Sequence, residues 1–144
     1  FLTQSANPTA DADIMSRFSG VENLEDLNQK IAHASSNGQW TLVDVYADWC
    51  VSCKVIEDEV FGDPRVQARF EDMQLIRPDV TANDATDRAL LEAYSILGPP
   101  TLMFFGPDGQ ERRAQRVVGE ISAVGFLERI DQARQAHHAN GGNS

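Results

Sequence analysis

Short apolar runs alternate along the chain with segments in which hydrophobic residues recur at helical spacing. Residues 40–47, Trp-Thr-Leu-Val-Asp-Val-Tyr-Ala, are mainly β-branched and aromatic, which is typical of a strand covered on both faces. A helix is predicted over residues 21–34, where apolar residues lie three and four positions apart: Leu24, Leu27, Ile31 and Ala34. Ser19 followed by Glu22 fits a capping box, so we expect this helix to open just after Ser19.

The rest of the chain continues this alternation. Further helices are predicted over residues 50–60, over residues 64–70 after an N-cap at Asp63, and up to about Tyr94 after a cap at Asn83 or Asp84. Strands are predicted over residues 73–80, 101–105 and 115–118, with a tight turn at residues 106–109. Pro78 limits the pairing of the first of these strands. Ser122 caps a last helix, which carries Phe126, Leu127, Ile130 and Ala133.

The order of these elements predicts the fold class. A strand, a helical crossover and a second strand require parallel pairing, and the later hairpin adds antiparallel strands. We therefore expect an α/β protein with a thioredoxin-like fold, in which helices flank both faces of a central mixed β-sheet. Residues 14–136 form the domain in this interpretation, residues 1–13 a flexible tether and residues 137–144 a flexible tail.

Composition and charge narrow the function classes. The chain has 144 residues and a formal net charge of −10, which argues against nucleic-acid binding and against direct attachment to anionic lipids. No segment approaches the roughly 20 apolar residues that cross a bilayer. The length suits one domain, which we expect to be a monomer. The chain begins at Phe1 rather than Met, which we interpret as a domain processed or cut from a larger protein.

The cysteines carry the strongest chemical signal. There are two, Cys50 and Cys53, in a C-x-x-C arrangement. A structural zinc site needs four ligands, and His33, His137 and His138 are poorly spaced to complete one, so we expect neither a metal nor another cofactor. A purely structural disulfide would close too short a loop to stabilise the fold much. The alternative of two small buried hydrophobic residues remains, but the spacing favours reversible dithiol–disulfide exchange.

The position of the pair after a buried strand assigns a role to each cysteine. Cys50 at the start of a helix lies near unpaired backbone N–H groups and the positive end of the helix dipole, and both favour its thiolate. A thiolate is the species that attacks a disulfide. Cys53 lies one helical turn further on, where it can resolve the mixed disulfide that Cys50 forms.

Several motifs resemble one family. Residues 43–54, Val-Asp-Val-Tyr-Ala-Asp-Trp-Cys-Val-Ser-Cys-Lys, look like the active-site segment of the thioredoxin superfamily. Tyr-Ala-Asp-Trp-Cys, together with Val-Thr-Ala-Asn-Asp at residues 80–84 and Leu-Gly-Pro-Pro-Thr at residues 97–101, is similar to the C-terminal periplasmic domain of the DsbD family of thiol:disulfide interchange proteins. The resemblance covers about residues 13–134.

The resemblance implies a thiol–disulfide oxidoreductase acting as a protein-disulfide reductase. Such a domain takes electrons from a membrane-embedded dithiol and passes them to an N-terminal periplasmic domain of the same parent protein, which keeps disulfide isomerases and cytochrome c maturation proteins reduced. The implied partners are thus the transmembrane and N-terminal domains of that parent. The implied location is the periplasmic side of a bacterial inner membrane, and the only redox group is the Cys50–Cys53 disulfide.

Two carboxylates fit this chemistry. Asp44 alternates with Val43 and Val45 in an apolar strand, so its side chain lies on one face, and the resemblance places it beneath the cysteine pair. Glu57 lies four residues after Cys53, on the same helix face, although a solvated acid there is the plainer alternative. We expect both acids to raise the pKa of Cys50 and to relay protons.

The substrate-facing residues are expected to be Trp49, Pro99 and Pro100. Trp49 precedes the first cysteine, where core packing is an equally plain interpretation. The resemblance implies a cis peptide bond between Pro99 and Pro100, in a loop that faces Cys50. Pro99 lacks an N–H, so we expect weak strand-type capture of unfolded substrates and docking through folded surfaces instead.

Two alternatives remain open at this stage. One is a free-standing periplasmic thioredoxin-like reductase that serves cytochrome c maturation or disulfide repair. The other belongs to a different class, a non-catalytic docking module that keeps the fold without thiol turnover. Replacing both cysteines separates them, because a docking module would keep its function.

Overall fold

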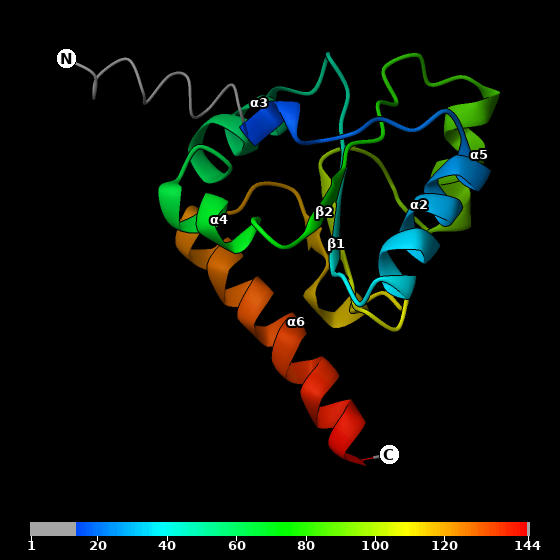
Figure 1. Cartoon of the computed structure of the whole chain (residues 1–144). Coiled ribbons are helices and arrows are strands. Elements are labelled where there is room, and N and C mark those ends of the chain that lie inside the picture. Colours follow the sequence, from blue (N-terminus) through cyan, green and yellow to red (C-terminus); the bar gives the residue numbers. More distant parts are fainter. Residues whose placement is uncertain (1–13, 144) are drawn as a thin grey trace.

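The fold is built on one mixed sheet. The computed structural model describes residues 14–143 (Figure 1). Within them, a four-stranded sheet has the order β2-β1-β3-β4. Its strands are β1 (Thr41–Val45), β2 (Gln74–Ile76), β3 (Thr101–Phe105) and β4 (Val117–Val118). β1 runs parallel to β2 and antiparallel to β3, and β4 is antiparallel to β3. The expected thioredoxin-like fold with a mixed sheet is confirmed.

Helices cover both faces of the sheet. They are α2 (Leu24–Ser36), α3 (Val51–Val55), α4 (Pro64–Arg69), α5 (Ala85–Ala93) and α6 (Ala123–Asn143), with a π-helical segment η1 (Ile56–Val60) that continues α3. Figure 1 shows α2 and α5 on one side of the strands, and α4 and α6 on the other. The side chains of β1 alternate accordingly: Val43 and Val45 pack in the cluster of α2 and α5, and Leu42 packs in the cluster of η1 and α6.

The helix starts follow from local capping chemistry. Asp63 and Asp84 each accept a hydrogen bond from a backbone N–H of the first turn, of α4 and α5 respectively, as expected. Asn83 has a φ of 51°, a left-handed conformation, which leaves Asp84 as the cap. The Ser122 side chain accepts from the N–H of Gly125 at the start of α6. The backbone of α6 extends into the predicted tail, residues 137–144, whereas the predicted tether, residues 1–13, lies outside the described residues.

The first helix starts later than the capping box predicted. Asn23, not Ser19, is its N-cap and accepts a hydrogen bond from the N–H of Asp26 at 2.8 Å. The backbone of Ser19 is used elsewhere: its N–H donates to Leu75 and its carbonyl accepts from Arg77. This short parallel bridge beside β2 excludes Ser19 from the helix, and so the capping-box prediction is wrong.

Three other elements differ from their predicted lengths. β2 ends at Ile76, because Pro78 has no N–H to continue the ladder, although its carbonyl accepts from Tyr46 at 2.9 Å. The predicted fourth strand begins two residues late, since residues 113–115 form a 3₁₀ turn. The predicted helix over residues 50–60 widens to π-helical geometry from Ile56 onward.

Candidate active site

The cysteine pair lies at the junction of β1 and α3. Cys50 is the N-cap of α3, and its Sγ accepts a hydrogen bond from the N–H of Cys53 at 3.1 Å. The two residues form a disulfide with a Cα–Cα distance of 5.3 Å. Cys50 is 6% exposed and Cys53 only 1%, so a partner's sulfur reaches Cys50 more easily. Cys53 Sγ lies 3.9 Å from the carbonyl oxygen of Val45, and Val45 directly follows Asp44 in the chain.

A loop after β2 holds the segment that leads into Cys50. The Thr81 hydroxyl accepts a hydrogen bond from the N–H of Asp48 at 2.8 Å, and its backbone carbonyl accepts from the Trp49 indole at 3.0 Å. Trp49 is therefore fixed at one edge while 59% of its surface stays exposed. The sequence motif around Thr81 served only as a mark of resemblance, and this positioning role was not predicted.

Asp44 is the buried acid of the site. Its side chain is almost fully buried, and its Oδ2 makes no hydrogen bond within residues 14–143. Burial raises the pKa of Asp44 to about 8, the negative charge of Glu57 adds to the rise, and the positive charge of Arg77 opposes it. An acid with such a pKa exchanges its proton near neutral pH, in the range of an ordinary thiol.

Arg77 connects the two predicted acids. Its Nε and Nη2 each lie 2.7 Å from Oε2 of Glu57, and its Nε lies 4.0 Å from Oδ2 of Asp44. Burial lowers the pKa of Arg77, but the hydrogen bond and charge of Glu57, together with the charges of Asp44 and Tyr46, outweigh burial and raise the pKa overall. Glu57 is thus a paired, partly buried acid rather than a solvated one.

Composition and motif spacing did not indicate Arg77 as a site residue, but the strand register in the sequence could have done so. Val43 pairs with Ile76 in the parallel ladder of β1 and β2. The residues that follow, Asp44 and Arg77, must then lie side by side at the same end of the sheet. A register assigned from the two apolar runs would have brought this acid and base together.

An aromatic ring completes the cluster. The guanidinium carbon of Arg77 lies 3.5 Å from the ring centroid of Tyr46. Lys54 Nζ donates to the Tyr46 hydroxyl at 3.0 Å, and this hydrogen bond contributes most to the raised pKa of Lys54. Lys54 therefore contacts Tyr46, whereas Arg77 is the cation that lies against Asp44 and Glu57.

The two prolines lie at the same end of the sheet as the cysteines. The peptide bond between Pro99 and Pro100 is cis, as expected. Thr101, which follows them, pairs with Val45 of β1 and with Val118 of β4. The carbonyl of Pro100 accepts a hydrogen bond from Gly119, and the next residue, Glu120, accepts one from the Ser52 hydroxyl between the cysteines, at 2.8 Å. These bonds connect the proline loop, the β4 end and the start of α3.

Large apolar side chains are exposed at this end of the sheet. They lie beside Cys50, before the proline loop and at the end of β4: Trp49, Val51, Leu97 and Val118. Leu97 is 98% exposed. A set of exposed apolar side chains around a reactive sulfur is typical of a docking surface for another protein.

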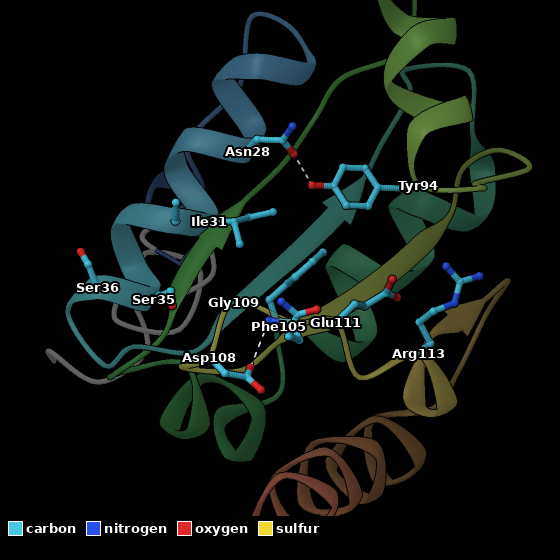
Figure 2. A pocket seen from close by; sticks show the side chains of 12 residues that line it. Asn28, Ile31, Ser35, Ser36, Tyr94, Phe105, Asp108, Gly109, Glu111 and Arg113 are labelled. Carbon is cyan, nitrogen blue, oxygen red and sulfur yellow. Dashed lines mark hydrogen bonds between the residues drawn. The ribbon is translucent and has the colours of Figure 1, made fainter. Parts of the chain in front are cut away.

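A groove lined by described residues lies away from this site. It measures about 600 Å³ and lies between α2 and the loop after β3 (Figure 2). Tyr94 donates a hydrogen bond to Asn28 across it. Phe105 lines the groove, and it lies at the end of β3 that is opposite to Thr101. None of the residues that line the groove belongs to the candidate active site.

Residues 14–143 contain neither a candidate metal site nor a helix that could span a membrane. Within residues 14–143, His, Cys, Asp and Glu side chains do not gather in threes or more in a way that could hold a metal ion. Every helix of the described chain is too short or too polar to cross a bilayer.

Known proteins match this chain in sequence and structure. The profile of a family described as thioredoxin-like matches residues 22–107. The thiol:disulfide interchange protein DsbD of Pseudomonas fluorescens is 47% identical over 83% of this chain, and DsbD 2 of Pseudomonas aeruginosa is 45% identical over 92% of it. The chain spans only 20% and 22% of the length of these relatives.

A solved structure agrees with the sequence relatives. The oxidised C-terminal domain of DsbD from Neisseria meningitidis superposes with a TM-score of 0.69 and is 28% identical. The match covers 80% of this chain and 99% of that domain. A thioredoxin from Thermus thermophilus, with a TM-score of 0.60 and 23% identity, shares the fold.

Proposed function

The chain belongs to the thioredoxin-like family and is a thiol–disulfide oxidoreductase domain of the kind found at the C-terminus of DsbD; from this premise we propose that it relays electrons between two protein partners. The donor in this proposal is a membrane-embedded dithiol, and the acceptor is an N-terminal periplasmic domain of the same parent protein. The domain would thus work on the periplasmic side of a bacterial inner membrane. The observation that carries the proposal is the Cys50–Cys53 disulfide at the N-cap of α3, with Cys50 the more exposed partner.

Reduction of the domain begins at Cys50. A thiolate of the donor attacks Cys50 Sγ, the bond to Cys53 breaks, and Cys53 leaves as a thiolate that takes a proton from the protonated Asp44. The second donor thiolate then attacks the donor sulfur of the mixed disulfide and releases Cys50 as a thiolate. Two electrons have passed to the domain, and the donor is left as a disulfide.

Delivery to the acceptor reverses these steps. The Cys50 thiolate attacks the acceptor disulfide and forms a mixed disulfide, with one acceptor thiolate leaving. Cys53 gives its proton to the Asp44 carboxylate and attacks Cys50 Sγ, which releases the second acceptor thiolate and restores the Cys50–Cys53 disulfide. The pKa of Asp44, about 8, suits this transfer because an ordinary thiol has a pKa of about 8.5.

The surface around the site supports docking of a folded partner. Trp49, Leu97 and Val118 offer exposed apolar area next to Cys50 and the proline loop. Pro99 has no N–H, so this edge offers a partner strand one hydrogen bond fewer than another residue would. We assign Trp49, Pro99 and Pro100 to the substrate-facing surface on these grounds.

Trapping of the mixed disulfide tests the proposed relay. A Cys53→Ala variant keeps the attacking sulfur but cannot resolve, so it should accumulate a covalent, dithiothreitol-sensitive complex with the oxidised N-terminal domain of the parent protein. Cys50→Ala is the matched control and should form much less of it. Equal trapping by both variants would contradict the roles of the cysteines, and no trapping by either would contradict the proposed acceptor.

A further inference from the structure

Arg77 lies beside Asp44 and Glu57, although proton transfer between Asp44 and a cysteine does not itself need an arginine. It follows β2 directly, and the pairing of Val43 with Ile76 brings it next to Asp44. Its backbone N–H donates to the carbonyl of Ser19 at 2.8 Å, which fixes the main chain from the outer side. The side chain therefore starts from a rigid point at the edge of the sheet.

The guanidinium lies between an aromatic face and two acids. It is 3.5 Å from the ring centroid of Tyr46, 2.7 Å from Glu57 through two nitrogens, and 4.0 Å from Asp44 through one. A planar group can stack on the ring and donate in its plane at the same time, which an ammonium group cannot do. The geometry is thus specific to arginine.

Arg77 makes different contacts with Glu57 and with Asp44. Glu57 accepts short hydrogen bonds from Arg77, so its charge is compensated in place. Asp44 is too far from Arg77 for a hydrogen bond, and its Oδ2 has no hydrogen-bond partner among the described residues. Two acids whose surroundings differ in this way take different protonation roles.

We propose that Arg77 is a positioning residue of the proton relay: it holds Glu57 in an ion pair and leaves Asp44 as the single acid that exchanges a proton with Cys53. The proposal rests on the role of Asp44 given under the proposed function. Without Arg77, the unpaired charge of Glu57 would oppose ionisation of both Asp44 and the cysteine thiols.

The titratable groups around Arg77 lie at the end of β1, in the loop that follows it, in and before α3, and in η1. They are Asp44 and Tyr46 at the end of β1, Asp48 in the following loop, Cys50, Cys53 and Lys54 around α3, and Glu57 in η1. Lys54 hydrogen-bonds the Tyr46 hydroxyl, so it does not replace Arg77 at Glu57.

The test is the pH dependence of thiol exchange in the reduced domain. Single-turnover reaction with glutathione disulfide should show a rate that rises with pH as the thiols ionise. In Arg77→Gln this rise should move to higher pH by about one unit, which is roughly a tenfold slower reaction at pH 7. Arg77→Lys keeps the charge but loses the stacked, in-plane geometry, so it should recover only part of the shift.

A second replacement and a matched control sharpen the test. Glu57→Gln combined with Arg77→Gln removes both opposite charges and should bring the profile back near that of the parent. Arg65→Gln removes an arginine that pairs with Asp63 at the start of α4, and it should leave the profile unchanged. A stability change without a shifted profile in Arg77→Gln would mean a purely structural role and overturns the inference.

Asp44→Asn distinguishes failure of this inference from failure of its premise. A shifted profile in Asp44→Asn with an unshifted one in Arg77→Gln overturns the role of Arg77 alone. A parental profile in Asp44→Asn overturns the proton-acceptor role on which the inference rests. Shifted profiles in both, with recovery in the combined Glu57→Gln and Arg77→Gln variant, support the whole arrangement.

Discussion

Asp44 links the chemistry of this domain to its stability. The residue lies in the central strand with a pKa of about 8, against an ordinary value of 3.8. Between these pH values the folded protein holds a proton that the unfolded chain has lost. The free energy of unfolding therefore falls as the pH rises from about 4 to about 8, and the full penalty applies above pH 8.

Asp44→Asn should consequently stabilise the oxidised domain, and by more at high pH. Each unit of raised pKa corresponds to about 1.4 kcal/mol, so the gain should reach a few kcal/mol at pH 9 and be smallest near pH 4. Urea unfolding of both proteins at pH 4, 7 and 9 measures it. Asp58→Asn, an exposed acid in η1, is the control and should follow the parent. A gain that does not change with pH would contradict a raised pKa at Asp44.

Single residues also mark how far the sequence alone could lead. The position of Asp44 inside an apolar run that is typical of a strand covered on both faces predicted its burial, and the C-x-x-C spacing predicted the reactive pair. The pairing of Glu57 was left open, because an acid three residues from the end of the predicted helix has no local signal for a partner. That partner, Arg77, is 20 residues away in sequence and meets Glu57 only through the parallel register of β1 and β2.

At the level of elements, local capping signals predicted most boundaries. Asp63, Asp84 and Ser122 all cap the helices assigned to them. The capping box predicted at Ser19 is wrong, because the backbone of Ser19 forms a parallel bridge with Ile76 at the edge of β2. The π-helical turn of η1 was likewise beyond sequence reasoning, since no residue type marks it.

The loop after β2 acts on α3 through Thr81, and this gives a testable contact. Thr81→Val removes the acceptor for the Asp48 N–H and should lower stability by about 1 kcal/mol. Amide hydrogen exchange at Asp48 should become faster, while that of the sheet should change little. Thr86→Val, an exposed position in α5, is the matched control. Unchanged exchange at Asp48 would show that Thr81 does not hold the loop that precedes Cys50.

The molecule as a whole combines an acidic surface with one apolar rim. Its formal net charge is −10, yet Trp49, Val51, Leu97 and Val118 expose apolar area at the cysteine end of the sheet. Net charge keeps such a domain soluble, and the rim provides the area that a folded partner can bury. The edge at Pro99 contributes little backbone pairing, so the rim should supply most of the selectivity.

Leu97→Glu should therefore slow electron transfer to a folded partner without slowing reaction with a small disulfide. Losing the burial of one leucine side chain at a docked interface costs on the order of 1–2 kcal/mol, so transfer to the N-terminal partner domain should slow about tenfold. Glutathione disulfide needs no such surface, and its rate should stay within about twofold. Ala32→Glu is the matched control, because it adds the same charge on α2, away from the cysteines. Ser35 on the same helix donates a hydrogen bond to the carbonyl of Pro107, which follows the far end of β3. Ala32→Glu should therefore change neither rate. If Leu97→Glu slowed both substrates equally, or neither, the rim would not be the docking surface.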